Sequence, residues 1–263
     1  MEKNNEKKMI FESHAHYDDK KFDEDRETLL ASMRENGVEY IINVGASLAS
    51  TKATVALTEK YPFIYGAAGV HPSETAELNL DNFAWLLRQC VHPKIIAIGE
   101  IGLDYHWNEP DKETQQKWFR RQLVMAETQR LPVIIHSRDA AKDTLDIMRE
   151  MHCEKIGGVI HCFSYSKEMA REFLNMGFYL GIGGVVTFQN AKAIKEAVEY
   201  APMDRILLET DSPYLAPEPY RGQRNSSLNI PLIAEEIAKI KKMDYDEVVG
   251  ETNKNAKILF HID

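Results

Sequence analysis

Short apolar, often β-branched runs recur eight times along this sequence, and each is followed by a longer segment of helical period. The predicted strands are Met9–Ser13, Tyr40–Val44, Ile64–Ala68, Ile95–Glu100, Pro132–His136, Gly158–His161, Phe178–Ile182 and Arg205–Glu209. Strands that alternate with helices form a parallel sheet, and eight such units close into a barrel. The sequence therefore predicts an α/β fold, a (β/α)₈ TIM barrel.

Helical patterns fill the intervals between these runs. The predicted helices include Asp23–Asn36 before a C-capping Gly37, Thr114–Gln129, Ser166–Met176 and Ala191–Tyr200. The tail from Ile230 to Phe260 holds two more, one closing the barrel and one appended. The competing architecture is an open doubly wound sheet. Its Gly-rich phosphate turn after the first strand is replaced here by SHAHYDD.

The chain has 263 residues, close to the ~250 of one such barrel, so residues 1–263 are expected to form a single domain. Residues 1–8 are expected to be a flexible N-terminal extension. The three cysteines form no paired framework, the N-terminus lacks an apolar signal region, and no apolar run approaches the ~20 residues of a membrane span. These features predict a cytoplasmic protein without a membrane partner. No exposed apolar seam is evident, which favours a monomer.

The net charge is −9, whereas general nucleic-acid binders usually present a basic face. This charge argues against tight wrapping of DNA. It does not exclude binding of a single phosphate, because bound metal ions make the local electrostatic potential positive.

Ionisable side chains stand at the carboxyl ends of five predicted segments. In a barrel these ends meet at one face, where active sites occur. The residues are His14, His16, Glu100, His136, His161 and Asp211. Imidazole and carboxylate groups together suit a first-row divalent metal ion, or Mg²⁺ where carboxylates dominate. We predict that these six side chains are metal ligands.

Their positions also suggest individual roles. His14 and His16 are two residues apart on a strand, so both rings can reach one ion. Glu100 stands midway around the barrel and is predicted to bridge two metals. Asp211 is predicted to complete one metal's ligand set and to accept a proton from water.

Each residue also has a structural interpretation on its own. A strand-end histidine is often a hydrogen-bonded structural residue, Glu100 alone could form an ion pair at the rim, and Asp211 could be a helix N-cap. Independent structural histidines would not all choose the same end of the strands, so the joint pattern favours a metal site. Cys162 follows His161 and is predicted to pack or to lie in the turn rather than to act as a nucleophile.

The sequence resembles the TatD family of metal-dependent deoxyribonucleases, within the amidohydrolase-like barrel superfamily. The motifs that carry the resemblance are ESHAHYD, GVHP (Gly69–Pro72), IGEIGLDY (Ile98–Tyr105), PVIIHSRDA (Pro132–Ala140), GVIHCFS (Gly158–Ser164), LGIGGVVTF (Leu180–Phe188) and LLETDSPYLAPEPYRGQRN (Leu207–Asn225). The resemblance implies one metal on His14, His16, Glu100 and Asp211, and another on Glu100, His136 and His161. It also implies hydrolysis of DNA, single-stranded or at 3′ ends, as a 3′-to-5′ exonuclease.

Three positions depart from the family pattern. Glu12 stands where the family usually has Asp, Tyr165 where it commonly has Gly, and Ser226-Ser227 where it usually has Glu-Pro. None of them removes a predicted ligand. They bear on substrate preference rather than on metal chemistry.

Further residues are predicted to contact the substrate. Arg138, Arg221 and Arg224 are suited to hold phosphate oxygens, although each is also an ordinary loop charge. His71 and Tyr105 are included as contacts, and Tyr105, Trp107 and Phe188 are candidates to stack on a base. The alternative for His71 is a simple His-Pro turn. The alternative for the aromatic rings is packing in the core or at the rim.

Several functions compete with the nuclease. An amidohydrolase, lactonase or deaminase often bridges its metals with a carboxylated lysine, where this sequence has Glu100. A phosphatase that acts on small phosphate esters is harder to distinguish from a nuclease, because the acidic net charge does not disfavour a small substrate. A non-catalytic, metal-dependent nucleic-acid or protein binder is the alternative from another class. The ligand types suit two divalent ions, Zn²⁺, Mn²⁺ or Mg²⁺, with Ni²⁺ also compatible.

Overall fold

The computed structural model describes residues 8–263, and its eight parallel strands follow one another around the sheet in chain order. The strands are β1 (Ile10–Ala15), β2 (Val38–Val44), β3 (Ile64–Ala68), β4 (Ile95–Asp104), β5 (Val133–Arg138), β6 (Gly158–Ile160), β7 (Tyr179–Ile182) and β8 (Ile206–Leu208). The last strand returns to the first: Ser13 Oγ donates to the Leu208 carbonyl at 2.9 Å, and a parallel bridge joins Ala15 to Ser212. The predicted TIM barrel is confirmed. Apart from Lys8, the predicted flexible extension lies outside the described residues.

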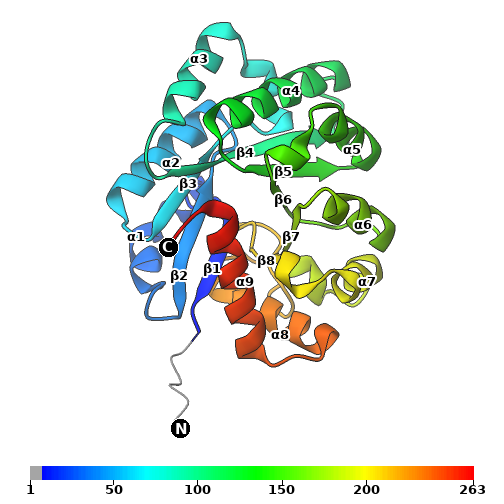
Figure 1. Ribbon diagram of the computed structural model, residues 1–263. Coiled ribbons are helices and arrows are strands. Elements are labelled where there is room, and N and C mark those ends of the chain that lie inside the picture. Colours follow the sequence, from blue (N-terminus) through cyan, green and yellow to red (C-terminus); the bar gives the residue numbers. More distant parts are fainter. Residues whose placement is uncertain (1–7) are drawn as a thin grey trace.

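Helices surround the ring of strands (Figure 1). The α-helices are α1 (Arg26–Ser32), α2 (Leu48–Lys60), α3 (Leu80–Gln89), α4 (Lys112–Gln129), α5 (Ala141–Glu150), α6 (Lys167–Asn175), α7 (Lys192–Tyr200), α8 (Ile230–Lys241) and α9 (Tyr245–Phe260). Short 3₁₀ helices are η1 (Lys20–Phe22), η2 (Pro72–Glu77), η3 (Cys153–Lys155), η4 (Gly184–Thr187), η5 (Met203–Arg205) and η6 (Ser227–Asn229). No helix within residues 8–263 combines the length and the apolar character needed to cross a membrane.

The element boundaries differ from the sequence prediction in informative places. Strand β4 continues beyond Glu100, where Asp104 pairs with Arg138 of β5. Strands β6 and β8 end earlier than predicted, so His161 and Glu209 lie just past their strands. Helix α1 begins at Arg26, later than predicted. Hydrophobic period alone marks a strand or helix but does not define its last residue.

One apolar cluster takes side chains from all eight strands. Its members are Phe11, Ile42, Val44, Ala67, Ala97, Ile134, Val159, Tyr179 and Leu207, together with Ala256, Leu259, Phe260 and Ile262 from the C-terminal segment. Because side chains alternate across a strand, this set fills the inside of the barrel. A second, larger cluster packs the helices against the outer faces of the strands.

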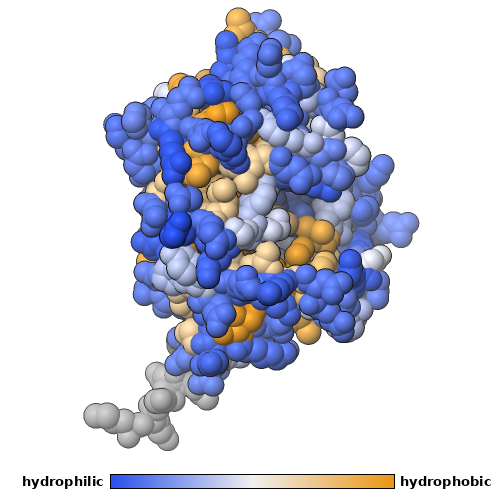
Figure 2. Space-filling model, turned by 90° about the vertical axis from the view of Figure 1, so that its right-hand side faces the viewer, coloured by the Kyte–Doolittle hydropathy of each residue, from blue (hydrophilic) through white to orange (hydrophobic). Residues whose placement is uncertain are grey.

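Helix α9 covers the amino-terminal end of the barrel. It lies across the ring of strands in Figure 1, and the Phe260 ring stacks on Phe11 with centroids 6.2 Å apart. Helix α8 instead packs beside α7 and η4, as the last helix of the outer ring. The face in Figure 2 is largely hydrophilic, with its hydrophobic side chains in separate patches. The apolar core thus closes the amino-terminal end of the barrel, and polar side chains can occupy the carboxyl ends of the strands.

Candidate metal centre

The Glu100 carboxylate lies between two groups of histidines at the carboxyl ends of the strands. Its Oε2 atom is 3.6 Å from Nε2 of both His14 and His16. Its Oε1 atom is 2.8 Å from His136 Nδ1 and 3.0 Å from His161 Nε2. Glu100 is only 4% exposed. Each oxygen of one buried carboxylate therefore faces a different set of imidazoles.

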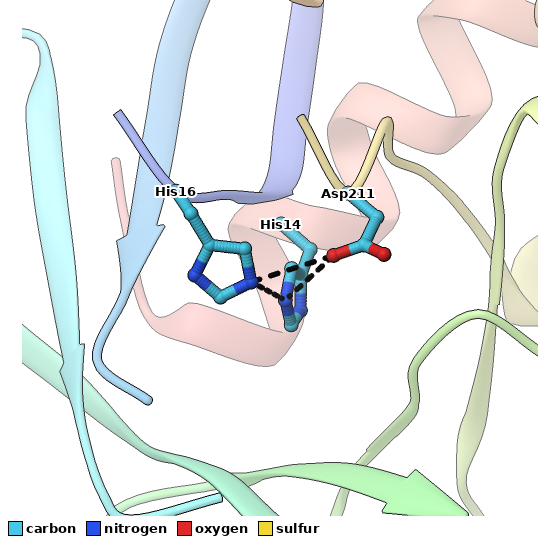
Figure 3. Close-up of side chains that lie close together, drawn as sticks. All are labelled: His14, His16 and Asp211. Carbon is cyan, nitrogen blue, oxygen red and sulfur yellow. Dashed lines mark hydrogen bonds and ion pairs between the residues drawn. The ribbon is translucent and has the colours of Figure 1, made fainter. Parts of the chain in front are cut away.

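The Oε2 side also contains Asp211, which follows β8. Figure 3 shows the two imidazoles of His14 and His16 and the Asp211 carboxylate pointing toward one another. The Nε2 atoms of His14 and His16 are 3.1 Å apart, and Asp211 Oδ1 is 3.7 Å and 3.4 Å from them, respectively. These three residues form one group whose donor atoms are close enough to share an ion.

On the Oε1 side, His71 lies beside the predicted ligands. His71 Nε2 is 3.8 Å from Glu100 Oε1, and its ring packs edge-on against His136 with centroids 4.3 Å apart. His71, Glu100 and His136 form a second group with ligand spacing, and His14, Glu100 and His161 form a third. His71 was predicted as a substrate contact. Its position allows a role at the centre itself.

The local fold of β1 delivers His14 and His16 to this place. The register of β1 against β2 shifts between Glu12 and Ala15, an irregularity that turns the following side chains. The buried Glu12 carboxylate accepts hydrogen bonds from the backbone N–H groups of His14 and Thr210 and from the Ser227 hydroxyl. Glu12 and Ser227, two of the departures from the family pattern, thus bind each other and join β1 to the β8 loop.

The electrostatics keep the two acidic groups ionised. Burial disfavours the Glu100 charge, but the His161 and His71 charges and hydrogen bonds with His136 and His14 outweigh it and hold the pKa of Glu100 well below its ordinary value. Burial likewise disfavours the Asp211 charge, but the hydrogen bond with His16 and the charge of His161 outweigh it. The pKa of Asp211 is therefore lowered. Two ionised carboxylates thus lie among five histidines at the mouth, and a divalent cation can replace the histidine protons as their partner.

The residues present fit a divalent metal centre. His14 Nδ1 is buried without a hydrogen-bond partner among residues 8–263, while its Nε2 faces His16 Nε2 at 3.1 Å. Two imidazole nitrogens at that distance cannot both donate protons to each other, and a cation shared with nearby carboxylates would satisfy both. The donor set is mixed nitrogen and oxygen, as borderline divalent metals prefer.

A pocket of about 740 Å³ opens over this centre, a volume that can hold a nucleotide-sized ligand. Predicted residues in its wall are His16, His71, Glu100, Trp107, His136, Arg138, His161 and Asp211. Arg138 is the only lysine or arginine among its described lining residues. The Trp107 ring is 58% exposed, with the Arg138 guanidinium 6.0 Å from its centroid.

Four other predicted contacts lie outside this lining. The Tyr105 hydroxyl donates to Asp143, and Arg224 forms a two-point ion pair with Asp25 at 2.6 and 2.7 Å. Arg221 packs over the ring of Phe188, 4.4 Å from its centroid. For these four residues, substrate contact stays a prediction, and it requires a substrate that extends beyond the pocket.

The loops explain two further sequence features. Cys162 has φ +47° in the turn after β6, and burial raises the pKa of its thiol to about 12, so it is a protonated packing residue. The Tyr165 hydroxyl lies 3.0 Å from Ser137 Oγ and accepts from the Ala140 N–H at 3.4 Å. Tyr165 thereby braces the chain on both sides of Arg138, the last residue of β5.

Sequence reasoning missed several residues around the centre. Asp104 and Glu209 lie behind His136 and His161, at 3.1 and 3.3 Å respectively. Asp18, Asp19 and Tyr214 line the pocket, where the Tyr214 hydroxyl donates to Asp19 at 2.7 Å. The available signal was an acid or tyrosine within four residues of a predicted ligand, which is too common to single out without the fold.

A barrel with clustered histidines and carboxylates at the carboxyl ends of its strands defines the class of metal-dependent hydrolases. The family model "TatD related DNase" matches residues 11–261, and the chain belongs to this family.

Individual relatives agree with this assignment. "Uncharacterized metal-dependent hydrolase YabD" of Bacillus subtilis is 42% identical over 97% of this chain and 100% of its own length. "3'-5' ssDNA/RNA exonuclease TatD" of Erwinia tasmaniensis is 31% identical over 92% of this chain and 95% of its own. The crystal structure of YJJV, a TatD homologue from Escherichia coli, has a TM-score of 0.90 at 29% identity and covers 97% of this chain and 98% of its own. The protein is a TatD-type metal-dependent hydrolase.

Proposed function

We propose that this protein hydrolyses phosphodiester bonds at the 3′ end of single-stranded DNA, using two divalent ions held on either side of Glu100. The observation that carries the proposal is the division of the Glu100 carboxylate, whose two oxygens face separate histidine groups. In this arrangement His14, His16 and Asp211 would hold one ion, and His136 and His161 would hold the other. Relatives named as exonucleases for single-stranded DNA and RNA support the substrate class.

The ions would supply Lewis-acid polarisation of the phosphoryl group and an acidified water, the chemistry expected of two-metal sites. The chain's own residues do the remainder. Asp211 is ionised and lines the pocket, so it can accept the proton that the attacking water loses. Arg138 stands at the pocket wall, where its guanidinium can hold a phosphate oxygen.

The pocket favours the end of a strand over its middle. Arg138 provides the only basic side chain in the described lining, while Asp18, Asp19 and Glu74 provide negative charge. A long DNA track needs a row of cations. One phosphate held by Arg138, with its base against the exposed Trp107 ring, needs only the groups present here.

The same charge distribution favours a second candidate, a phosphatase acting on a small phosphate ester. Such a substrate carries one phosphate and fills the pocket without extending over the acidic rim. The metal chemistry and the role of Asp211 are unchanged. Only the leaving group differs.

One comparative assay separates the two. The purified protein is incubated with Mg²⁺, Mn²⁺ or Zn²⁺ and with single- and double-stranded DNA, RNA, small phosphate esters and lactones. We expect shortening of single-stranded DNA from its 3′ end, and little activity on lactones. If DNA stays intact with every metal while an ester or lactone turns over, the nuclease proposal is wrong.

The Asp211→Asn variant, run in parallel, tests the proton acceptor. It keeps the size of the side chain but cannot accept a proton. Because Asp211 is also a proposed ligand, metal is added until elemental analysis shows full occupancy, and under that condition we expect DNA cleavage to fall by about 10²–10⁴-fold, the range for removal of a general base. Full cleavage by Asp211→Asn would show that another group takes the proton.

A further inference from the structure

Two buried carboxylates, Asp104 and Glu209, lie behind the histidines on the Oε1 side of Glu100. Asp104 Oδ2 is 3.1 Å from His136 Nε2, and Glu209 Oε1 is 3.3 Å from His161 Nδ1. In both histidines the other ring nitrogen faces Glu100 Oε1, at 2.8 Å for His136 and 3.0 Å for His161. Each ring therefore stands between a carboxylate at the centre and a second carboxylate behind it.

The barrel makes special room for Glu209. Glu209 is 0% exposed, and its side chain lies inside the barrel against β7. A Cβ on Gly181 would collide with Glu209 Oε2, so a larger residue at that position would force the carboxylate to move. Glu209 Oε1 accepts the Cys162 N–H, but Oε2 has no hydrogen-bond partner among residues 8–263. Burial of an incompletely paired carboxylate costs stability, which indicates that it serves a purpose other than packing.

Asp104 is held as firmly by a different set of contacts. Its Oδ1 atom accepts the His106 N–H at 3.0 Å. Its backbone N–H and C=O groups both bond to the side-chain amide of Gln115, at 2.9 Å each. The carboxylate is thus fixed in position, with Oδ2 left for His136.

Among residues 8–263, no carboxylate lies behind the histidines on the Oε2 side. His16 Nδ1 is 2.8 Å from the Val44 carbonyl, and His14 Nδ1 is buried without a hydrogen-bond partner in the described part of the chain. His161 Nδ1 also makes no hydrogen bond there, but it lies 3.3 Å from the Glu209 carboxylate as an ion-pair contact. The two sides of Glu100 therefore differ in what orients their imidazoles. A carboxylate behind a ligating imidazole fixes its tautomer and raises its basicity more than a carbonyl does.

We propose that Asp104 and Glu209 are positioning residues, which orient His136 and His161 toward one metal ion and strengthen that ion's binding selectively. The proposal rests on the metal centre of the proposed function. It adds that the two ions are bound unequally. The ion on the Oε1 side depends on both carboxylates, and the ion on the Oε2 side depends on neither.

Zinc binding in the absence of substrate tests this directly. Metal-free protein is titrated with Zn²⁺ by calorimetry in two backgrounds: Asp211→Asn, which weakens the Oε2-side ion, and His136→Ala, which weakens the Oε1-side ion. Glu209→Gln or Asp104→Asn is added to each. We expect an affinity loss of about 10–100-fold in the Asp211→Asn background, the usual effect of removing such a carboxylate. In the His136→Ala background we expect less than about threefold.

Asp143→Asn is the matched control. The Asp143 carboxylate is also partly buried, but it accepts from the Tyr105 hydroxyl and the Gln116 amide, not from an imidazole. Its Zn²⁺ affinity should stay close to that of the parent in both backgrounds. Circular dichroism of each metal-free variant checks folding, and Asp104→Asn, at the pocket wall, decides the question if Glu209→Gln does not fold.

The outcomes separate this proposal from the function it rests on. Equal losses in both backgrounds, no loss in either, or an equal loss from Asp143→Asn would overturn the positioning role while leaving the two-ion centre intact. If the unmodified protein binds no Zn²⁺, Mn²⁺ or Mg²⁺, the proposed function fails first.

Discussion

The two ends of the barrel differ in side-chain polarity: the amino-terminal end is apolar and the carboxyl end is lined by ionisable groups. At the amino-terminal end, α9 lays Phe260 and Leu259 on an apolar interior. At the carboxyl end, His14 and Glu100 on β1 and β4 and His161 just past β6 replace the apolar side chains. Burial of apolar groups stabilises the first end, whereas crowding of ionisable groups in the second opposes stability. We therefore expect substitutions at the amino-terminal end to change mainly the free energy of unfolding, and substitutions at the carboxyl end to change mainly metal binding and catalysis.

Glu100→Ala should have the largest effect. Loss of the shared carboxylate removes a ligand from both sides of the centre, so we expect both ions to be lost and hydrolysis to fall by at least about 10³-fold. Elemental analysis and cleavage rates measure the two effects. Thermal unfolding of the metal-free variant should move to lower temperature, because the lowered pKa of Glu100 means that its ionised carboxylate stabilises the folded protein beside the histidines. Full metal occupancy would contradict the bridging role.

Phe260→Ala should show the reverse behaviour. Phe260 is 2% exposed and stacks on Phe11, so we expect a loss of about 3–5 kcal/mol in the free energy of unfolding. Urea unfolding measures this loss. Below the unfolding transition, metal content and kcat should match the unmodified protein. A large drop in kcat of the folded variant would mean that the two ends are coupled.

Arg138→Ala tests the mouth without touching a predicted ligand. We expect KM for single-stranded DNA to rise by about 10-fold or more, because one charge-assisted phosphate contact contributes about 1.5–3 kcal/mol. Zn²⁺ content should not change. Arg138→Lys should recover part of the KM, since it restores charge but not the two-point fork. An unchanged KM would remove Arg138 from the substrate site.

Tyr165→Phe should have the smallest effect. It removes the hydroxyl that contacts Ser137 and Ala140 but keeps the ring. A hydrogen bond of this kind contributes about 0.5–1.5 kcal/mol, so we expect a change in KM of about two- to tenfold with kcat retained. Tyr165→Phe combined with Arg138→Ala should add little. Full additivity would show that Tyr165 acts independently of Arg138.

Much of this organisation was predictable from the sequence. Strand β3 was predicted with its observed bounds, and all eight strands were found in order, because a half-buried or fully buried strand leaves an apolar signature. His136 and His161 were assigned to one face because parallel strands place their carboxyl ends together. Local pattern and topology were sufficient for these conclusions.

Other features needed the folded chain. Asp104 and Glu209 look like ordinary acids in the sequence, and only packing against His136 and His161 distinguishes them. Arg224 looked like a phosphate ligand, yet in the structure it pairs with Asp25, about 200 positions away in the chain. Side-chain partners of this kind depend on contacts between distant segments, which no local pattern encodes.

The amino-acid sequence by itself thus determined the barrel, the ring of imidazoles and carboxylates, and the family, because periodicity and residue type are local properties. The tertiary structure alone decided how that ring divides. Only the closed barrel brings β1 beside β8 and turns one oxygen of Glu100 toward each histidine group, with carboxylates behind one group and not the other. Distances of a few ångströms between residues from different strands decide that division, and these arise only when the sheet closes.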